Sequence, residues 1–105
     1  MKYFMIYITA GSYNEAKRIA DILLRKKLVA CVNIIPKIES AYWWNGKIEK
    51  SSEVGMIAKT NNKHVSEVVK KVKDIHSDSI PCIVALPVTK GNNDYFKWIS
   101  EVVGK

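Results

Sequence analysis

Four side chains of this sequence are the candidate ligands of a metal ion, and they fall in two places. Cys31 lies in an apolar run, whereas His76, Asp78 and Cys82 lie close together in a polar segment. A soft thiolate suits Cu(I) and also responds to redox conditions, and imidazole is a further copper ligand. The pattern therefore predicts His76, Cys31 and Cys82 as candidate ligands of copper or another divalent cation, with Asp78 as an additional donor.

Each candidate ligand also has a simpler interpretation. Free cysteines usually behave as small buried apolar residues, which fits Cys31 in its apolar run. A lone imidazole is a weak copper site, and the dipole of a preceding helix would favour His76 as a solvated residue at the helix end. His64, near the start of the same predicted helix, is interpreted as a surface residue. Because Cys31 and Cys82 fall on different predicted strands, they would meet only through a second copy of the chain.

The sequence contains no arrangement typical of an active site. It has no Cys-His pair at helical spacing, no glycine-rich phosphate loop, no His-x-x-x-His motif and no paired carboxylates. We therefore interpret the protein as a non-enzyme that requires no cofactor.

The composition is that of one small basic domain. With 105 residues, of which 48% are hydrophobic, positions 1–105 are expected to form a single core. The formal net charge is +7, but the lysines are scattered and Arg18 and Arg25 are the only arginines, which argues against a nucleic-acid-binding surface. No apolar run approaches the roughly 20 residues that span a bilayer. Cysteines without paired spacing and the lack of a leader segment predict a reduced, cytoplasmic protein.

Alternating and continuous apolar patterns predict the strands. The β-prone runs lie at residues 3–9, 29–35, 38–44, 47–59 and 82–88. The first run is typical of a central strand buried on both faces. Pro36 interrupts the second, which fits an edge strand or a bulge. Asn45-Gly46 is the commonest pair for a type I′ turn, so it predicts a long hairpin.

Helical periodicity predicts three helices, at residues 12–27, 61–76 and 95–102. Ser12 and Glu15 match a capping box, in which each side chain bonds the other residue's backbone N–H. Asn61-Asn62 offers an N-cap for the second helix. The order β-α-β-β-α-β with a short C-terminal helix predicts an α+β, ferredoxin-like sandwich that has an antiparallel sheet and both main helices on one face. The other face of this sheet would then lack a cover.

Several runs, in order along the chain, match one known family. They are Ala30-Cys31-Val32-Asn33-Ile34-Ile35-Pro36, Ser40-Ala41-Tyr42-Trp43-Trp44-Asn45-Gly46-Lys47-Ile48, Lys59-Thr60, Ala85-Leu86-Pro87-Val88, Gly91-Asn92, Asp94-Tyr95 and Trp98-Ile99. Together they strongly resemble CutA, the divalent-cation tolerance family, over nearly the whole chain.

The resemblance implies a ferredoxin-like fold similar to the PII signalling proteins and a tight homotrimer. In the family the long hairpins reach across to neighbouring subunits, which would bury Trp43 or Trp44 between chains. The implied function is divalent-cation tolerance, through weak copper binding or through protein contacts.

One segment departs from the family pattern. Family members often carry His-Pro-Tyr and then a Pro-Glu pair, whereas this chain has Ser77, Asp78 and Cys82 in place of the proline, the tyrosine and a glutamate. Copper-binding relatives also carry a cysteine and a second histidine where this chain has Ile8 and Ile75. Of that set only His76 can bind a metal, so the resemblance implies an altered site.

Two further functions remain open at the level of sequence. A PII-like sensor or scaffold would bind a small anion or metabolite in clefts between subunits, and its inter-subunit and cleft residues would be Tyr42, Trp43, Trp44, Lys59 and Tyr95. An RNA-binding module is the other, because the aromatic residues of a ferredoxin-like sheet can stack on bases. The basic-Gly-aromatic signature of that module is absent from the sequence.

Overall fold

The computed structural model describes residues 2–104, and its elements follow the predicted order. They are β1 (Tyr3–Ala10), α1 (Tyr13–Arg25), β2 (Cys31–Trp44), β3 (Lys47–Asn61), the 3₁₀ turn η1 (Asn62–His64), α2 (Val65–Ile75), β4 (Ile83–Val88) and α3 (Asn93–Val103). This arrangement confirms the α+β, ferredoxin-like fold class. Among the described helices, none combines the length and the apolar character needed to cross a membrane.

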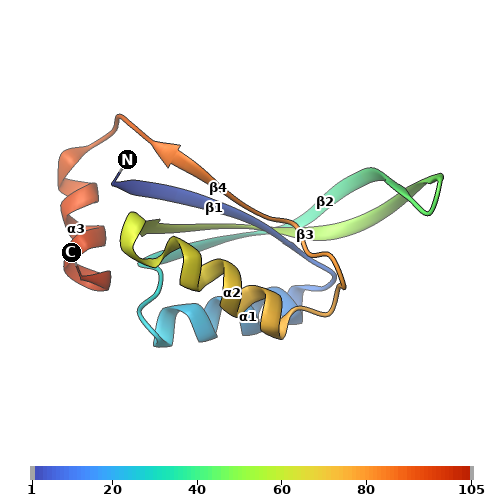
Figure 1. The fold of residues 1–105 in the computed structure, drawn as a ribbon, viewed down its shortest axis with the longest axis horizontal. Coiled ribbons are helices and arrows are strands. Elements are labelled where there is room, and N and C mark those ends of the chain that lie inside the picture. The colour runs from blue at the N-terminus through green and yellow to red at the C-terminus, as the bar shows by residue number, and fades with distance from the viewer. Residues whose placement is uncertain (1, 105) are drawn as a thin grey trace.

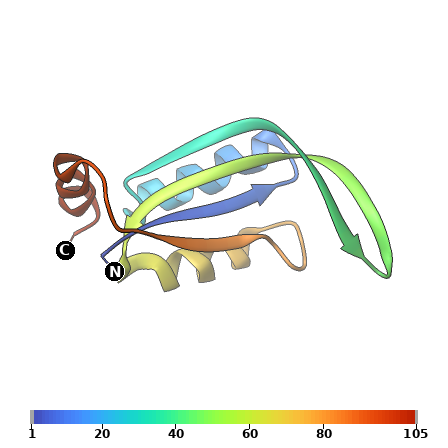
Figure 2. The ribbon, with the colours of Figure 1, turned by 90° about the horizontal axis from the view of Figure 1, so that it is seen from above.

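The four strands form one sheet in the order β2-β3-β1-β4, and every neighbouring pair is antiparallel. Figures 1 and 2 show α1 and α2 beneath one face of this sheet and α3 at its end. β1 is therefore a central strand, as predicted, and β2 and β4 are the edges. The β2–β3 hairpin projects well beyond the helices, which gives the molecule extents of 44 × 26 × 22 Å.

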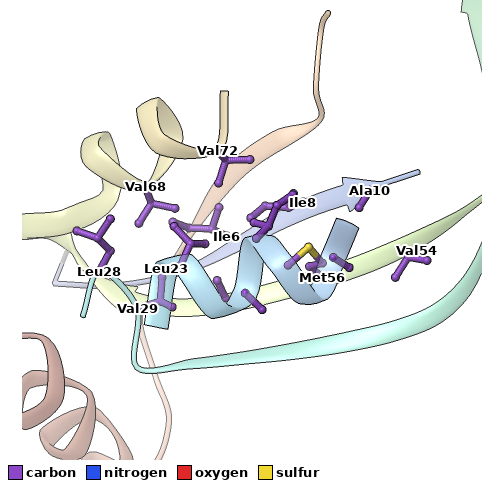
Figure 3. Close-up of a cluster of buried hydrophobic side chains, with 14 residues drawn as sticks. Ile6, Ile8, Ala10, Leu23, Leu28, Val29, Val54, Met56, Val68 and Val72 are labelled. Carbon is purple, nitrogen blue, oxygen red and sulfur yellow. The ribbon is translucent and has the colours of Figure 1, made fainter. Parts of the chain in front are cut away.

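The core fills the space between the sheet and the helices α1 and α2 (Figure 3). Ile6 of β1, Leu23 of α1 and Val72 of α2 belong to it and are fully buried. Side chains alternate along a strand, so Met5 and Tyr7 lie on the opposite face of β1, where they are only partly buried. The prediction that this strand is buried on both faces is wrong for the single chain, because its helices cover only one face.

The sheet face opposite α1 and α2 is largely apolar, and within residues 2–104 only α3 packs against it, at one end. Cross-strand pairing sets Tyr7 opposite Val84 and Met5 opposite Leu86, which places all four on this face. Val84 and Leu86 are 49% and 51% exposed. We call this surface the open face, and it comprises Tyr3, Met5, Tyr7, Cys31, Asn33, Ile35, Ile57, Lys59, Val84, Leu86 and Val88.

The hairpin forms as its turn residues predict. Asn45 and Gly46 both have positive φ, at 52° and 77°, as a type I′ turn requires. Pro36 lies within a register shift between Ile35 and Ile38, on the edge strand β2. Both the predicted turn and the predicted edge or bulge position are confirmed.

Two polar side chains near the start of α2 hold the end of α3. Asn61 Nδ2 donates to the carbonyl oxygen of Gly104 at 2.6 Å, and His64 Nε2 lies 2.6 Å from that of Val103. These bonds satisfy carbonyls that a helix end leaves free. The predicted N-cap is wrong, because Asn61 makes no capping bond and α2 begins only at Val65. The prediction of a surface histidine is also wrong, since His64 is half-buried against α3.

The predicted capping box forms only in part. Ser12 Oγ accepts from the N–H of Glu15 at 3.1 Å, as expected. The Glu15 carboxylate, however, accepts from the N–H of Gly11 at 3.1 Å and from the N–H and hydroxyl of Ser77 at 2.8 and 2.9 Å. Burial alone would raise the pKa of Glu15, but the hydrogen bonds from Ser77 and Gly11, with a smaller electrostatic contribution from the nearby His76 ring, outweigh it and lower the pKa below its ordinary value. Glu15 therefore joins α1 to the segment that precedes β4.

We expect Glu15→Ala to lower the free energy of unfolding by about 2 kcal/mol at pH 7, because two backbone donors lose their acceptor. Glu49→Ala, at an exposed hairpin position, is the matched control. Since the folded pKa of Glu15 is lowered, its charge stabilises the fold above the ordinary pKa of 4.5, and this is lost as the pH falls through the folded pKa. Urea unfolding at fixed protein concentration from pH 7 to pH 3 measures the free energy of unfolding of wild type and variant. A difference between the two that stays constant in acid would contradict the assignment.

Candidate functional site

The His76 side chain is fully buried at the end of α2, and both ring nitrogens have partners. Nε2 lies 2.7 Å from the carbonyl oxygen of Thr9, and Nδ1 accepts from the N–H of Asp78 at 3.0 Å. This pattern assigns the proton to Nε2. Nδ1 is also 3.9 Å from a carboxylate oxygen of Glu15. The interpretation of His76 as a solvated residue is therefore wrong, and a metal ion on this ring would have to displace one of its bonds.

Cys82 lines a cavity that the buried His76 ring does not reach. Cys82 is exposed, and this cavity, of about 820 Å³, lies between the base of the hairpin and the segment before β4. Glu39, Glu53 and Asp78 line the same cavity, which has no Lys or Arg in its lining, whereas His76 does not line it. We call it the acidic cavity. Within residues 2–104, no three His, Cys, Asp or Glu side chains are placed to hold one metal ion.

The Cys82 thiol is shifted toward its protonated form. Partial burial raises its pKa, the Thr9 side chain offsets part of this through a hydrogen bond, and the nearby charge of Glu53 raises the pKa further. A metal ion that binds this sulfur must therefore displace a proton.

Cys31 lies on the open face beside a lysine. It is directly opposite Lys59 across the β2–β3 ladder, and Lys59 Nζ is 3.7 Å from its sulfur. The same ammonium group donates to Asn33 Oδ1. Tyr95 of α3 completes the cluster: burial raises the pKa of Tyr95, and Cys31 raises it further. The structure thus brings together Cys31, Lys59 and Tyr95.

The hairpin aromatics lie away from this cluster. Trp43 is 71% exposed near the turn, and Tyr42 and Trp44 are also exposed. Tyr42 and Trp44 line the acidic cavity. Trp43 lines neither that cavity nor the one that Lys59 lines. Of the predicted cleft residues, only Lys59 and Tyr95 come together within the chain. The two cysteines lie at opposite edges of the sheet, as the separate strands predicted.

Sequence reasoning missed Asn33 as a partner of Lys59. The signal was present, because alternation along β2 places residue 33 on the same face as residue 31. It also missed Glu15 and Thr9 as partners of His76. No local pattern could have shown these, since Thr9 is 67 residues from His76 along the chain.

The fold and the site define a small ferredoxin-like protein with a projecting hairpin, an uncovered sheet face and no assembled metal centre within residues 2–104. The profile of the CutA1 divalent ion tolerance protein family matches residues 4–102. This chain therefore belongs to the CutA1 family, which confirms the resemblance found in the sequence.

Relatives across that family agree in sequence and in structure. The divalent-cation tolerance protein CutA of Archaeoglobus fulgidus is 52% identical over 98 residues, which are 93% of this chain and 95% of the relative. The Xenopus laevis CutA homolog is 39% identical over 92% of this chain, which spans only 64% of that protein. The solved structure of the divalent cation tolerance protein of Thermus thermophilus matches with a TM-score of 0.94. It is 35% identical and covers 97% of this chain and 99% of that one.

We expect His76→Ala to lower the free energy of unfolding by about 3 kcal/mol, because it leaves a cavity and unpaired polar groups around Thr9 and Asp78. Hydrogen exchange should quicken at residues 77–82, which His76 holds. Lys73→Ala, on an exposed position of α2, is the control. Equal stability of the two variants would show that the ring is not anchored as described.

Proposed function

We propose that this protein acts in divalent-cation tolerance as a homotrimer, and that copper binds weakly at ligands that neighbouring subunits share. Membership of the CutA1 family supports the link to divalent cations. The observation that carries the assembly is the open face, with its half-exposed Val84 and Leu86.

Physical chemistry favours self-association through this face. A domain of this size has little surplus stability, so leaving many apolar side chains in water is costly. Trp43 and Ile48 near the hairpin turn add further apolar surface, at 71% and 60% exposed. A second and a third copy of the chain are complementary occupants, because each offers the same apolar surfaces.

The acidic cavity is the part of the surface best suited to a cation. The chain carries a net charge of +7, so it repels cations in general. Locally, Glu39, Glu53 and Asp78 line the same cavity as Cys82, and its lining contains no lysine. A soft sulfur with carboxylate oxygens offers an incomplete copper site, and a neighbouring subunit would have to supply the remaining ligand. Cys31 is less suited, since the Lys59 ammonium group lies 3.7 Å from its sulfur.

Replacing Leu86 by Asp should convert the trimer to monomer, because three carboxylates would be buried in the assembly. Leu24→Asp is the matched control, since Leu24 is a half-exposed leucine on α1, away from the open face. Trp43→Ala combined with Trp44→Ala should also dissociate the trimer by removing the hairpin contacts. Light scattering after size-exclusion chromatography gives the masses. Trimers that survive both the Leu86 and the tryptophan changes would refute the assignment.

For copper, we expect Cys82→Ser to lower the affinity for Cu(I) at least about tenfold, while Cys31→Ser leaves it unchanged. Because the raised pKa keeps the Cys82 thiol protonated, binding releases a proton, and the affinity should rise up to about tenfold per pH unit. Anaerobic titration against a chromophoric chelator measures the Cu(I) affinity between pH 6 and pH 8. An affinity independent of pH, or equal losses in both serine variants, would remove Cys82 from the proposal.

A further inference from the structure

A second cavity lies on the open face, where the end of the sheet meets α3. Its volume is about 370 Å³, within the range of small-molecule sites. Tyr3 and Lys59 line it from the sheet, Lys90 from the loop after β4, and Tyr95 and Phe96 from α3. It shares no lining residue with the acidic cavity. We call it the basic cavity.

The charge of the basic cavity is uniform. Lys59 and Lys90 line it, and no Asp or Glu does. The partners of Lys59 are Asn33 and Cys31, neither of them a carboxylate. Within residues 2–104, neither lysine forms an ion pair. Two positive charges that meet in one partly enclosed space without a counter-charge favour an anionic ligand.

The remaining wall is aromatic and held in place. Tyr3 and Phe96 are stacked with ring centroids 4.8 Å apart and planes 14° apart. The Tyr3 hydroxyl is fixed by a 2.7 Å hydrogen bond to Ser100 Oγ. Tyr95 lies against Trp98 at 5.6 Å. Fixed rings of this kind favour a flat apolar group in the ligand, because little side-chain freedom is lost on binding.

A glycine permits this arrangement. A Cβ atom at Gly91 would lie 2.8 Å from Cζ of Phe96, which is too close for the ring to keep its position. The absence of a side chain at residue 91 therefore lets Phe96 lie in the cavity wall, stacked on the Tyr3 ring.

We infer that the basic cavity binds a small molecule in which a planar ring carries a carboxylate or phosphate group. The ring lies against Tyr3, Tyr95 and Phe96, and the anionic group lies between Lys59 and Lys90. This ligand site is independent of the proposed copper site, since the two cavities have no residue in common. Lys59 belongs to the open face, which the proposed trimer covers, so a neighbouring subunit would border this cavity and the test uses the assembled protein.

Four probes separate the contribution of the ring from that of the charge. They are phenyl phosphate and benzoate, which have both groups, phenol, which has the ring, and inorganic phosphate, which has the charge. NMR titration follows the backbone amides of residues 90–96, and light scattering follows the oligomeric state. We expect phenyl phosphate or benzoate to bind at least about tenfold more tightly than phenol or phosphate, with shifts concentrated at these amides. Whichever of the two binds more tightly shows whether the site prefers a phosphate or a carboxylate.

Three variants test the assignment of the walls. Lys90→Gln should weaken binding of the ring-bearing acids about tenfold and leave phenol unchanged. Gly91→Ala should displace Phe96 and weaken the binding of phenol and of the ring-bearing acids alike. Lys73→Gln, on an exposed position of α2, should change nothing. The inference would be overturned if inorganic phosphate bound as tightly as phenyl phosphate, or if none of the probes bound. It would also be overturned if the amide shifts fell outside residues 90–96, or if Lys90→Gln bound the ring-bearing acids as wild type does.

Discussion

A four-stranded sheet has two faces, and α1 and α2 cover only one of them, while α3 packs against just one end of the other. α1 and α2 bury Ile6 and its neighbours completely, whereas Met5, Val84 and Leu86 on the other face stay partly exposed. The core between sheet and helices is sufficient to define the fold. The remaining apolar face is what supports the proposed trimer, in which further copies of the chain would cover it.

The two ends of the sheet differ in charge, and each contains one cysteine. Cys82 lies among carboxylates in the acidic cavity, while Cys31 lies 3.7 Å from the Lys59 ammonium group. The separation follows from the strand order, because β2, which begins at Cys31, and β4, which Cys82 precedes, are opposite edges of the sheet. One small domain therefore offers a surface suited to cations and another suited to anions, although its net charge is +7.

Local sequence patterns predicted the elements but not the long-range contacts. The Asn45-Gly46 turn and the irregularity at Pro36 could be predicted because each depends on the backbone preference of one or two residues. The roles of Glu15, His64 and His76 could not, because each has a partner 39 to 67 residues away that becomes a neighbour only in the fold. Polar side chains in general bond whatever donor the fold brings near, so their roles follow from topology.

The central claim is that other copies of this chain cover the open face. Sedimentation equilibrium of the wild-type protein at several micromolar concentrations measures the mass of the assembly without any substitution. The account predicts a single species of three times the 11.9 kDa chain mass at all concentrations. A species of one chain mass, with the open face in solvent, would contradict it.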